Sequence, residues 1–155
     1  MLEIERKFLV DDVTSCLKEA KASFSIFQGY LSNDPARTVR LRICNKQALL
    51  TVKGASSSDG TTRVEWEKEI TLKEAETLLP LCLPGDIRKT RHHVYHKQHL
   101  FEVDVFEGAL NGLVIAEIEL KNTNQEIELP DWIGKEVTGD NRYYNSYLAT
   151  HGIPS

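Results

Sequence analysis

The chain has 155 residues, of which 41% are hydrophobic and 27% are charged. This balance is typical of a folded soluble protein, so we expect one domain over residues 1–155 and exclude a disordered or multidomain chain. The 19 basic and 23 acidic residues give a formal net charge of −4. That sign excludes a protein whose whole surface binds nucleic acid, so any anion must be bound locally.

Cysteine usage and the N-terminal segment bear on location. Cys16, Cys44 and Cys82 are odd in number, far apart and without C-x-x-C spacing, which is typical of reduced thiols. The first residues lack the apolar stretch of a signal peptide, and no run reaches membrane-spanning length. We therefore expect a cytoplasmic protein with no membrane partner, while a homodimer is left open.

Period-2 alternation of apolar and polar residues dominates the chain and predicts eight strands. They lie at about 3–10, 25–31, 37–44, 48–53, 63–70, 88–96, 99–106 and 113–121, and a Gly/Ser/Thr-rich loop covers 54–62. Shorter signals predict helices over Asp12–Lys21, after the capping-box sequence that begins at Thr71, and over Asp140–His151. The expected fold is mostly antiparallel β with peripheral helices.

Each strand can be divided into two rows, because successive side chains point to opposite sides of a sheet. One row is apolar, as in Val39, Leu41 and Ile43. The other row is almost purely ionic and holds Glu3, Glu5, Lys7, Arg40, Arg42, Lys53, Arg63, Glu65, Glu67, Glu69, Lys89, Arg91, Glu102, Asp104, Glu117, Glu119 and Lys121.

Two interpretations of the ionic row remain open on the residues alone. It is either the solvated face of an open sheet, or the lining of a tunnel formed when eight strands close into a barrel. In a tunnel, clustered carboxylates suit Mg²⁺ or Mn²⁺, and clustered Arg and Lys suit phosphate oxygens. Both sets together indicate a site for a polyanion that carries a metal ion, as in phosphoryl transfer.

A series of short motifs follows the ionic row in chain order. It comprises Glu3-Ile4-Glu5-Arg6-Lys7, Arg40-Leu41-Arg42, Lys53, Glu65-Trp66-Glu67, Lys89-Thr90-Arg91, Glu102-Val103-Asp104 and Glu117-Ile118-Glu119. The series resembles that of the CYTH superfamily, the triphosphate tunnel metalloenzymes, over nearly the whole chain. Within that superfamily the chain looks most similar to small bacterial inorganic triphosphatases, also through Gln28-Gly29-Tyr30-Leu31 and a C-terminal Asn145.

The resemblance implies an eight-stranded antiparallel closed barrel that hydrolyses a phosphoanhydride bond of tripolyphosphate with Mg²⁺ or Mn²⁺, with a C-terminal helix closing one end. The residues that it implies for metal binding are Glu3, Glu5, Glu117 and Glu119. Those that it implies for substrate binding are Lys7, Arg40, Arg42, Lys53, Lys89 and Arg91. An acidic wall for a second metal or the attacking water would be completed by Glu65, Glu67 and Asp104.

A tyrosine paired with a lysine is the proton acceptor proposed for the most similar relatives, and these positions match Tyr30 and Lys89. A tyrosine needs a cationic neighbour for this task, because its ordinary pKa is near 10. Two other activities share the motifs: a class IV adenylate cyclase and an organic triphosphatase acting on thiamine or nucleoside triphosphates. A non-catalytic module that binds polyphosphate is the third alternative.

Overall fold

The structure is a computed structural model that describes residues 1–155. Its strands are β1 (Leu2–Val10), β2 (Ala20–Ser32), β3 (Arg37–Cys44), β4 (Gln47–Gly54), β5 (Thr62–Ile70), β6 (Ile87–His96), β7 (His99–Phe106), β8 (Val114–Glu119) and β9 (Ile133–Glu136). Its helices are α1 (Val13–Lys18), α2 (Leu72–Leu78) and α3 (Asn145–His151), with 3₁₀ turns η1 (Leu79–Leu81), η2 (Gly108–Leu110) and η3 (Asn141–Tyr143). None of the helices is long and apolar enough to cross a membrane.

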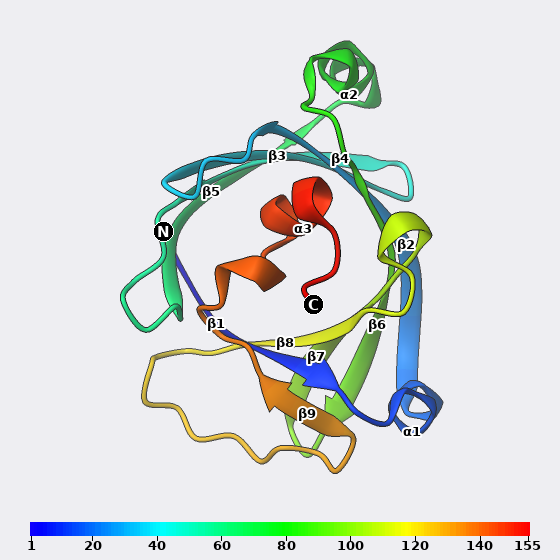
Figure 1. Cartoon of the computed structure of the whole chain (residues 1–155), viewed down its shortest axis with the longest axis vertical. Coiled ribbons are helices and arrows are strands. Elements are labelled where there is room, and N and C mark those ends of the chain that lie inside the picture. Colours follow the sequence, from blue (N-terminus) through cyan, green and yellow to red (C-terminus); the bar gives the residue numbers. More distant parts are fainter.

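Strands β1 to β8 form a closed antiparallel barrel in the order β1-β5-β4-β3-β2-β6-β7-β8, seen end-on in Figure 1. The ring closes at β1, which pairs with β8 along one edge. Its other edge is shared between β5, where Leu2 lies opposite Val64, and β9, where Phe8 lies opposite Glu136. The closed barrel decides between the two interpretations of the ionic row, because its inner face is a tunnel.

Part of the apolar row packs beneath short elements outside the ring of strands, such as α1 and α2 in Figure 1, while Val64 and Trp66 of this row are exposed. Phe8, Val94, Phe101 and Ala116 lie in one buried cluster, which also contains Cys16 of α1. A second cluster packs Leu41 and Ala48 against Ala75 of α2, which begins with the predicted capping box. Burial of these side chains against the helices supplies an outer core, so the barrel interior is free to hold charge. The three cysteines are free thiols, as predicted.

One end of the barrel is filled by the C-terminal helix, which lies inside the ring of strands in Figure 1. Leu148 of α3 packs in a buried cluster with Tyr30, Ile87, Phe106 and Ile115, whose strands line the barrel. Ile87 and Lys89 share one face of β6, so the apolar plug borders the ionic part of the tunnel. The expectation that a C-terminal helix closes one end is confirmed.

Two helices and two strands differ from the sequence prediction, and one of the strands is β2, which begins at Ala20 rather than near residue 25. The helix predicted over Asp12–Lys21 ends at Lys18, because β2 begins at Ala20 and pairs there with Val94 of β6. The helix predicted over Asp140–His151 is divided into η3 and α3, because Tyr144 between them has extended backbone angles. The short strand β9 was not predicted.

Strand β9 forms on the free half-edge of β1. The bidentate pair between Arg6 and Glu136, with N–O distances of 2.8 and 2.9 Å, fastens it there. A four-residue strand carries too little alternation to be recognised in a sequence.

Candidate active site

The tunnel holds a cavity of about 390 Å³ lined by side chains from every strand of the barrel and from the C-terminal segment. Four of its 25 lining residues are hydrophobic, so the site is built almost entirely from polar and charged groups. The predicted site residues that line it are Glu3, Glu5, Lys7, Tyr30, Arg40, Arg42, Lys53, Glu65, Glu67, Lys89, Arg91, Glu117 and Glu119. Asp104 is the one predicted site residue outside this lining.

Strand register places opposite charges next to one another. Glu117 of β8 lies opposite Lys7 of β1, and Glu65 of β5 lies opposite Lys53 of β4. Since alternate residues face inward on every strand, each pair projects into the tunnel from neighbouring strands. The same register places Glu5 opposite Glu119 and Glu102 opposite Glu117, so bases separate only some of the acids of neighbouring strands.

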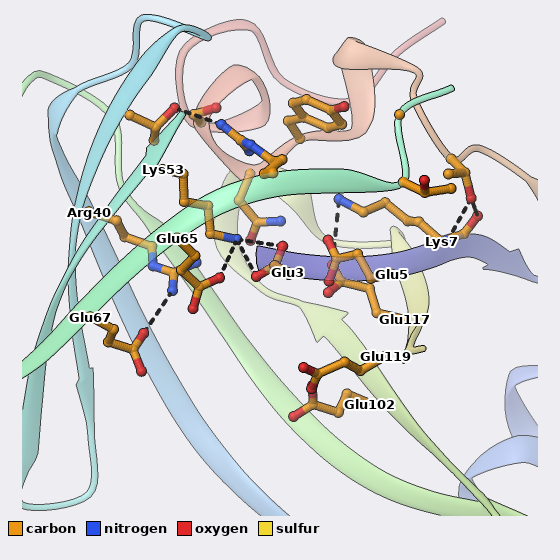
Figure 2. A pocket seen from close by; sticks show the side chains of 18 of the residues that line it. Glu3, Glu5, Lys7, Arg40, Lys53, Glu65, Glu67, Glu102, Glu117 and Glu119 are labelled. Atoms are coloured by element: carbon orange, nitrogen blue, oxygen red, sulfur yellow. Dashed lines mark hydrogen bonds and ion pairs between the residues drawn. The ribbon is translucent and has the colours of Figure 1, made fainter. Parts of the chain in front are cut away.

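The resulting ion pairs hold most of the charged groups in place (Figure 2). Lys53 lies between two carboxylates, with its Nζ 3.0 Å from Glu3 Oε2 and 3.7 Å from Glu65 Oε2. Lys7 Nζ lies 3.5 Å from Glu117 Oε1, and Arg40 Nη2 lies 3.6 Å from Glu67 Oε2. These acids and bases of the tunnel therefore neutralise one another.

Asp104 lies behind the lining as a buried anchor for two cations. Its Oδ2 is 2.7 Å from Lys89 Nζ, and Arg91 donates to both of its carboxylate oxygens at 2.7 and 2.9 Å. Burial opposes its ionisation, but Lys89 and Arg91 outweigh that effect and lower the pKa of Asp104. In this structure its carboxylate supports two cations rather than facing the tunnel.

The carboxylates of β1 and β8 are crowded. Burial, together with the nearby charges of Glu117 and Glu3, raises the pKa of Glu5 well above its usual range. Burial also opposes ionisation of Glu3, but the hydrogen bond with Glu65 and the charge of Lys53 lower its pKa to about 2. The same hydrogen bond raises the pKa of Glu65 to about 7, so these two carboxyls share a proton.

Comparisons with known proteins agree with this geometry. The model of the CYTH domain family matches residues 1–146. The chain belongs to the CYTH family. An inorganic triphosphatase of Acetivibrio thermocellus is 44% identical over 147 residues, covering 94% of this chain and 92% of that protein. An inorganic triphosphatase of Nitrosomonas europaea is 36% identical over 154 residues, covering 96% and 97% of the two chains.

Solved structures show the same CYTH fold. The crystal structure of an inorganic triphosphatase superposes with a TM-score of 0.68 at 33% identity, covering 99% of this chain and 97% of that one. An adenylyl cyclase candidate from Hippeastrum, whose structure revealed a dominant triphosphatase activity, superposes with a TM-score of 0.63 over 77% and 80% of the chains. Its identity is 14%, so this second likeness concerns the fold alone.

A divalent metal ion, which CYTH triphosphatases require, fits the chemistry of the acidic residues. Carboxylate oxygens are the ligands that Mg²⁺ and Mn²⁺ prefer. Glu65 Oε2 is buried without a hydrogen-bond partner, and burial together with the charges of Glu117 and Glu3 disfavours the ionised carboxylate of Glu5, so both would gain from a cation. No three acidic, His or Cys side chains already converge on one point, because Lys7 and Lys53 occupy their carboxylates. A metal ion bound by Glu117 or Glu3 would have to displace a lysine from that carboxylate, whereas Glu5 and Glu119 form no ion pair with a lysine.

Tyr30 and Lys89 both line the tunnel but have different partners. Lys89 Nζ donates to Asn145 Oδ1 at 2.8 Å besides its pair with Asp104, and burial lowers its pKa to about 7 despite that charge. Tyr30 is buried, which raises its pKa, although Arg40 and Arg42 partly offset the effect. The lysine is therefore the member of the pair that titrates near neutral pH.

The site also involves residues that were not assigned to it from the sequence, which line the cavity or, like Gln28, contact its lining. Glu102 belongs to the ionic row and lines the cavity. Its position in the alternation of β7 could therefore have identified it as a site residue from the sequence. Tyr144 and Asn145 come from the irregular C-terminal segment, where no periodicity indicates direction. Gln28 is fully buried and interacts with Tyr30, Arg42 and Asn145 from an uncharged position in the row.

Proposed function

We propose that this protein is an inorganic triphosphatase, a hydrolase that cleaves a phosphoanhydride bond of tripolyphosphate inside the tunnel with Mg²⁺ or Mn²⁺ as cofactor. The observation that carries the proposal is the tunnel itself, a cavity inside the closed barrel in which Arg and Lys side chains face carboxylates from adjoining strands. Support comes from the two relatives named inorganic triphosphatases, which align over more than nine-tenths of both chains. With four hydrophobic lining residues, the tunnel offers little surface to bind a nucleotide base, which favours the inorganic substrate.

The substrate is held by side chains. The six basic residues proposed to bind it are Lys7, Arg40, Arg42, Lys53, Lys89 and Arg91. A guanidinium can donate two parallel hydrogen bonds to phosphate oxygens, whereas an ammonium acts as a point charge. The Nε of Arg40 is buried without a partner, so it is a donor available to a phosphate oxygen.

The carboxylates proposed to bind the metal are Glu3, Glu5, Glu117 and Glu119. Glu65 and Glu67 extend this acidic wall and are proposed to hold a second ion or to orient the attacking water, with Asp104 holding Lys89 and Arg91 from behind. When bound, the metal supplies charge neutralisation on the phosphate oxygens and makes the phosphorus a better electrophile. When phosphate oxygens pair with Lys7 and Lys53, the carboxylates that these lysines hold are released.

Hydrolysis requires an acceptor for one proton of the attacking water. The water oxygen forms a bond to a terminal phosphorus, the bridging P–O bond breaks, and orthophosphate and pyrophosphate leave. We assign the acceptor to the Tyr30 and Lys89 pair, with the neutral amine of Lys89 taking the proton, because its pKa of about 7 suits a base at neutral pH. Tyr30, whose pKa is raised, stays protonated and contributes its hydroxyl to the site.

The deciding experiment measures phosphate release from tripolyphosphate, ATP and thiamine triphosphate by the purified protein, each with Mg²⁺, with Mn²⁺ and with EDTA. We expect rapid, EDTA-sensitive release from tripolyphosphate and slow release from the two organic substrates. Conversion of ATP into cyclic AMP and pyrophosphate would instead identify a cyclase. Tight tripolyphosphate binding without turnover would identify a binding module.

A further inference from the structure

Arg42 differs from the other five cations proposed to bind phosphate. Lys7, Arg40, Lys53, Lys89 and Arg91 each have a carboxylate within 4.0 Å. No carboxylate lies within that distance of Arg42, whose Nε and Nη2 both donate to Gln28 Oε1, at 2.9 and 2.6 Å. Its positive charge is therefore held in place without being neutralised.

Gln28 reaches Arg42 because the two residues are direct partners in the register of β2 and β3. Its side chain is fully buried, and all three of its described partners belong to the lining of the tunnel. A neutral amide in this position fixes the direction of the guanidinium through a single carbonyl oxygen, which accepts both of its hydrogen bonds. A glutamate of the same shape would fix the same direction but cancel the charge.

The arginine also determines which way the Gln28 amide points. A guanidinium can only donate, so the carbonyl of Gln28 must face Arg42 and its NH₂ group must face away. That NH₂ group donates to Tyr30 Oη and to Asn145 Oδ1, each at 3.3 Å. Asn145 Oδ1 in turn accepts from Lys89 Nζ at 2.8 Å. The Gln28 side chain thus contacts Arg42, Tyr30 and Asn145 directly. Through Asn145, the first residue of α3, it is also connected to Lys89.

We infer that Gln28 is a positioning residue, which keeps Arg42 aimed into the tunnel and fully charged for a phosphate group. Because Tyr30 Oη accepts a hydrogen bond from this amide, the Tyr30 hydroxyl proton is available to donate to a phosphate oxygen. The inference rests on the proposed function, since it specifies how that site binds a polyphosphate anion. It predicts that Gln28 acts on the substrate through Arg42.

The test is a double-mutant cycle on tripolyphosphate binding, measured by titration calorimetry in EDTA so that no turnover occurs. Gln28→Met removes both the acceptor and the donor while keeping the length of the side chain. We expect it to raise the Kd of the otherwise unaltered protein about tenfold, because a hydrogen bond to a charged group is lost. In the Arg42→Met background the same change should alter the Kd less than about twofold. A change of that size is no larger than the usual deviation from additivity between independent sites.

Two further variants separate positioning from folding. Gln28→Glu keeps the shape and the acceptor but neutralises Arg42, so it should weaken binding at least as much as Gln28→Met. Gln98→Glu, at an exposed hairpin position, is the matched control and should leave the Kd unchanged. Melting temperatures identify any variant that fails to fold. If Gln28→Met does not fold, the inference is tested by comparing the Kd of Gln28→Glu with that of Gln98→Glu.

Turnover with Mg²⁺ supplies a second readout, in which the loss for Gln28→Met should fall mainly on KM rather than on kcat. An unchanged Kd in folded Gln28 variants, or the same loss with and without Arg42, would overturn the inference while leaving the triphosphatase proposal intact. A wild-type protein that binds tripolyphosphate without hydrolysing it would contradict the triphosphatase proposal alone. A wild-type protein that binds no tripolyphosphate would overturn both.

Discussion

Lys89 and Asp104 form an ion pair in which Nζ and Oδ2 are 2.7 Å apart and each side chain is 1% exposed. Such a pair is weak evidence of stability, because desolvation of two charges offsets much of their attraction. The ion pair matters here because it fixes the position of the Lys89 side chain. Asp104 also accepts two of the three hydrogen bonds of Arg91, whose Nη1 donates to Glu102, so one buried carboxylate holds two cations at the wall of the tunnel.

Removal of the Asp104 charge should destabilise the protein strongly. Asp104→Asn leaves the buried Lys89 without its ion-pair partner and leaves Arg91 with Glu102 alone, and breaking a buried pair typically costs about 3–5 kcal/mol. Urea unfolding measures this loss. Asp86→Asn is the control, because Asp86 pairs with Arg88 in an exposed position, where a pair contributes about 0–1 kcal/mol. Equal losses of unfolding free energy in the two variants would show that Asp104 does not neutralise the charges of Lys89 and Arg91.

The pH dependence of turnover should report Lys89. Burial lowers its pKa to about 7, so the neutral amine that accepts a proton becomes populated as the pH rises through that value. We expect kcat/KM for tripolyphosphate to rise through an acidic limb near pH 7. Tyr30→Phe should lower the rate but keep the limb, because the pKa of Tyr30 is raised and its hydroxyl does not ionise in this range. A limb that disappears in Tyr30→Phe would assign the proton acceptor to the tyrosine.

The barrel and most of its lining could be predicted from the sequence, because alternation is a direct consequence of strand geometry. Arg40 and Arg42 on one strand, or Glu117 and Glu119 on another, fall on one face whatever the rest of the fold does. Closure was not decided by alternation, since an open sheet shows the same two rows. It depends on the pairing of Leu2 with Val64, a contact between distant segments.

The remainder of the site depends on tertiary contacts that leave no local pattern. Gln28 gains its role only because β3 places Arg42 opposite it and α3 brings Asn145 to its other side. Asp104 has the alternation of a lining residue but lies behind Lys89 and Arg91, because the two cations fill the space in front of it. Residues of irregular segments, such as Tyr144, have no period from which a direction can be inferred.

Neutralisation of Glu5 should separate activity from stability. Its pKa is raised by burial and by Glu117 and Glu3, so the folded protein loses stability as the pH rises from the ordinary pKa of a glutamate toward the raised value. Glu5→Gln should therefore increase the free energy of unfolding at neutral pH, measured by urea titration without metal. The same variant should lower metal-dependent turnover at least about a hundredfold, because a hard anionic ligand is lost.

Glu119→Gln tests the same ligand set from the opposite strand, since Glu119 faces Glu5 in the register of β1 and β8. It should lose turnover to a similar extent. Glu69→Gln is the control, because Glu69 lies on the ionic row but outside the cavity lining, and its turnover should be unchanged. Full activity in either Glu5→Gln or Glu119→Gln would remove that residue from the metal site.

The plug formed by α3 should be required for both stability and turnover. Leu148 is 1% exposed inside the barrel, so Leu148→Ala should cost about 2–5 kcal/mol of unfolding free energy by creating a cavity beside Tyr30 and Ile87. Ile153→Ala, in an exposed position after the helix, should cost much less. Because Asn145 begins α3 and accepts the hydrogen bond of Lys89, loosening the plug should also reduce kcat at temperatures where the protein is still folded. A destabilised but fully active Leu148→Ala protein would show that the helix only fills the barrel and does not position Lys89.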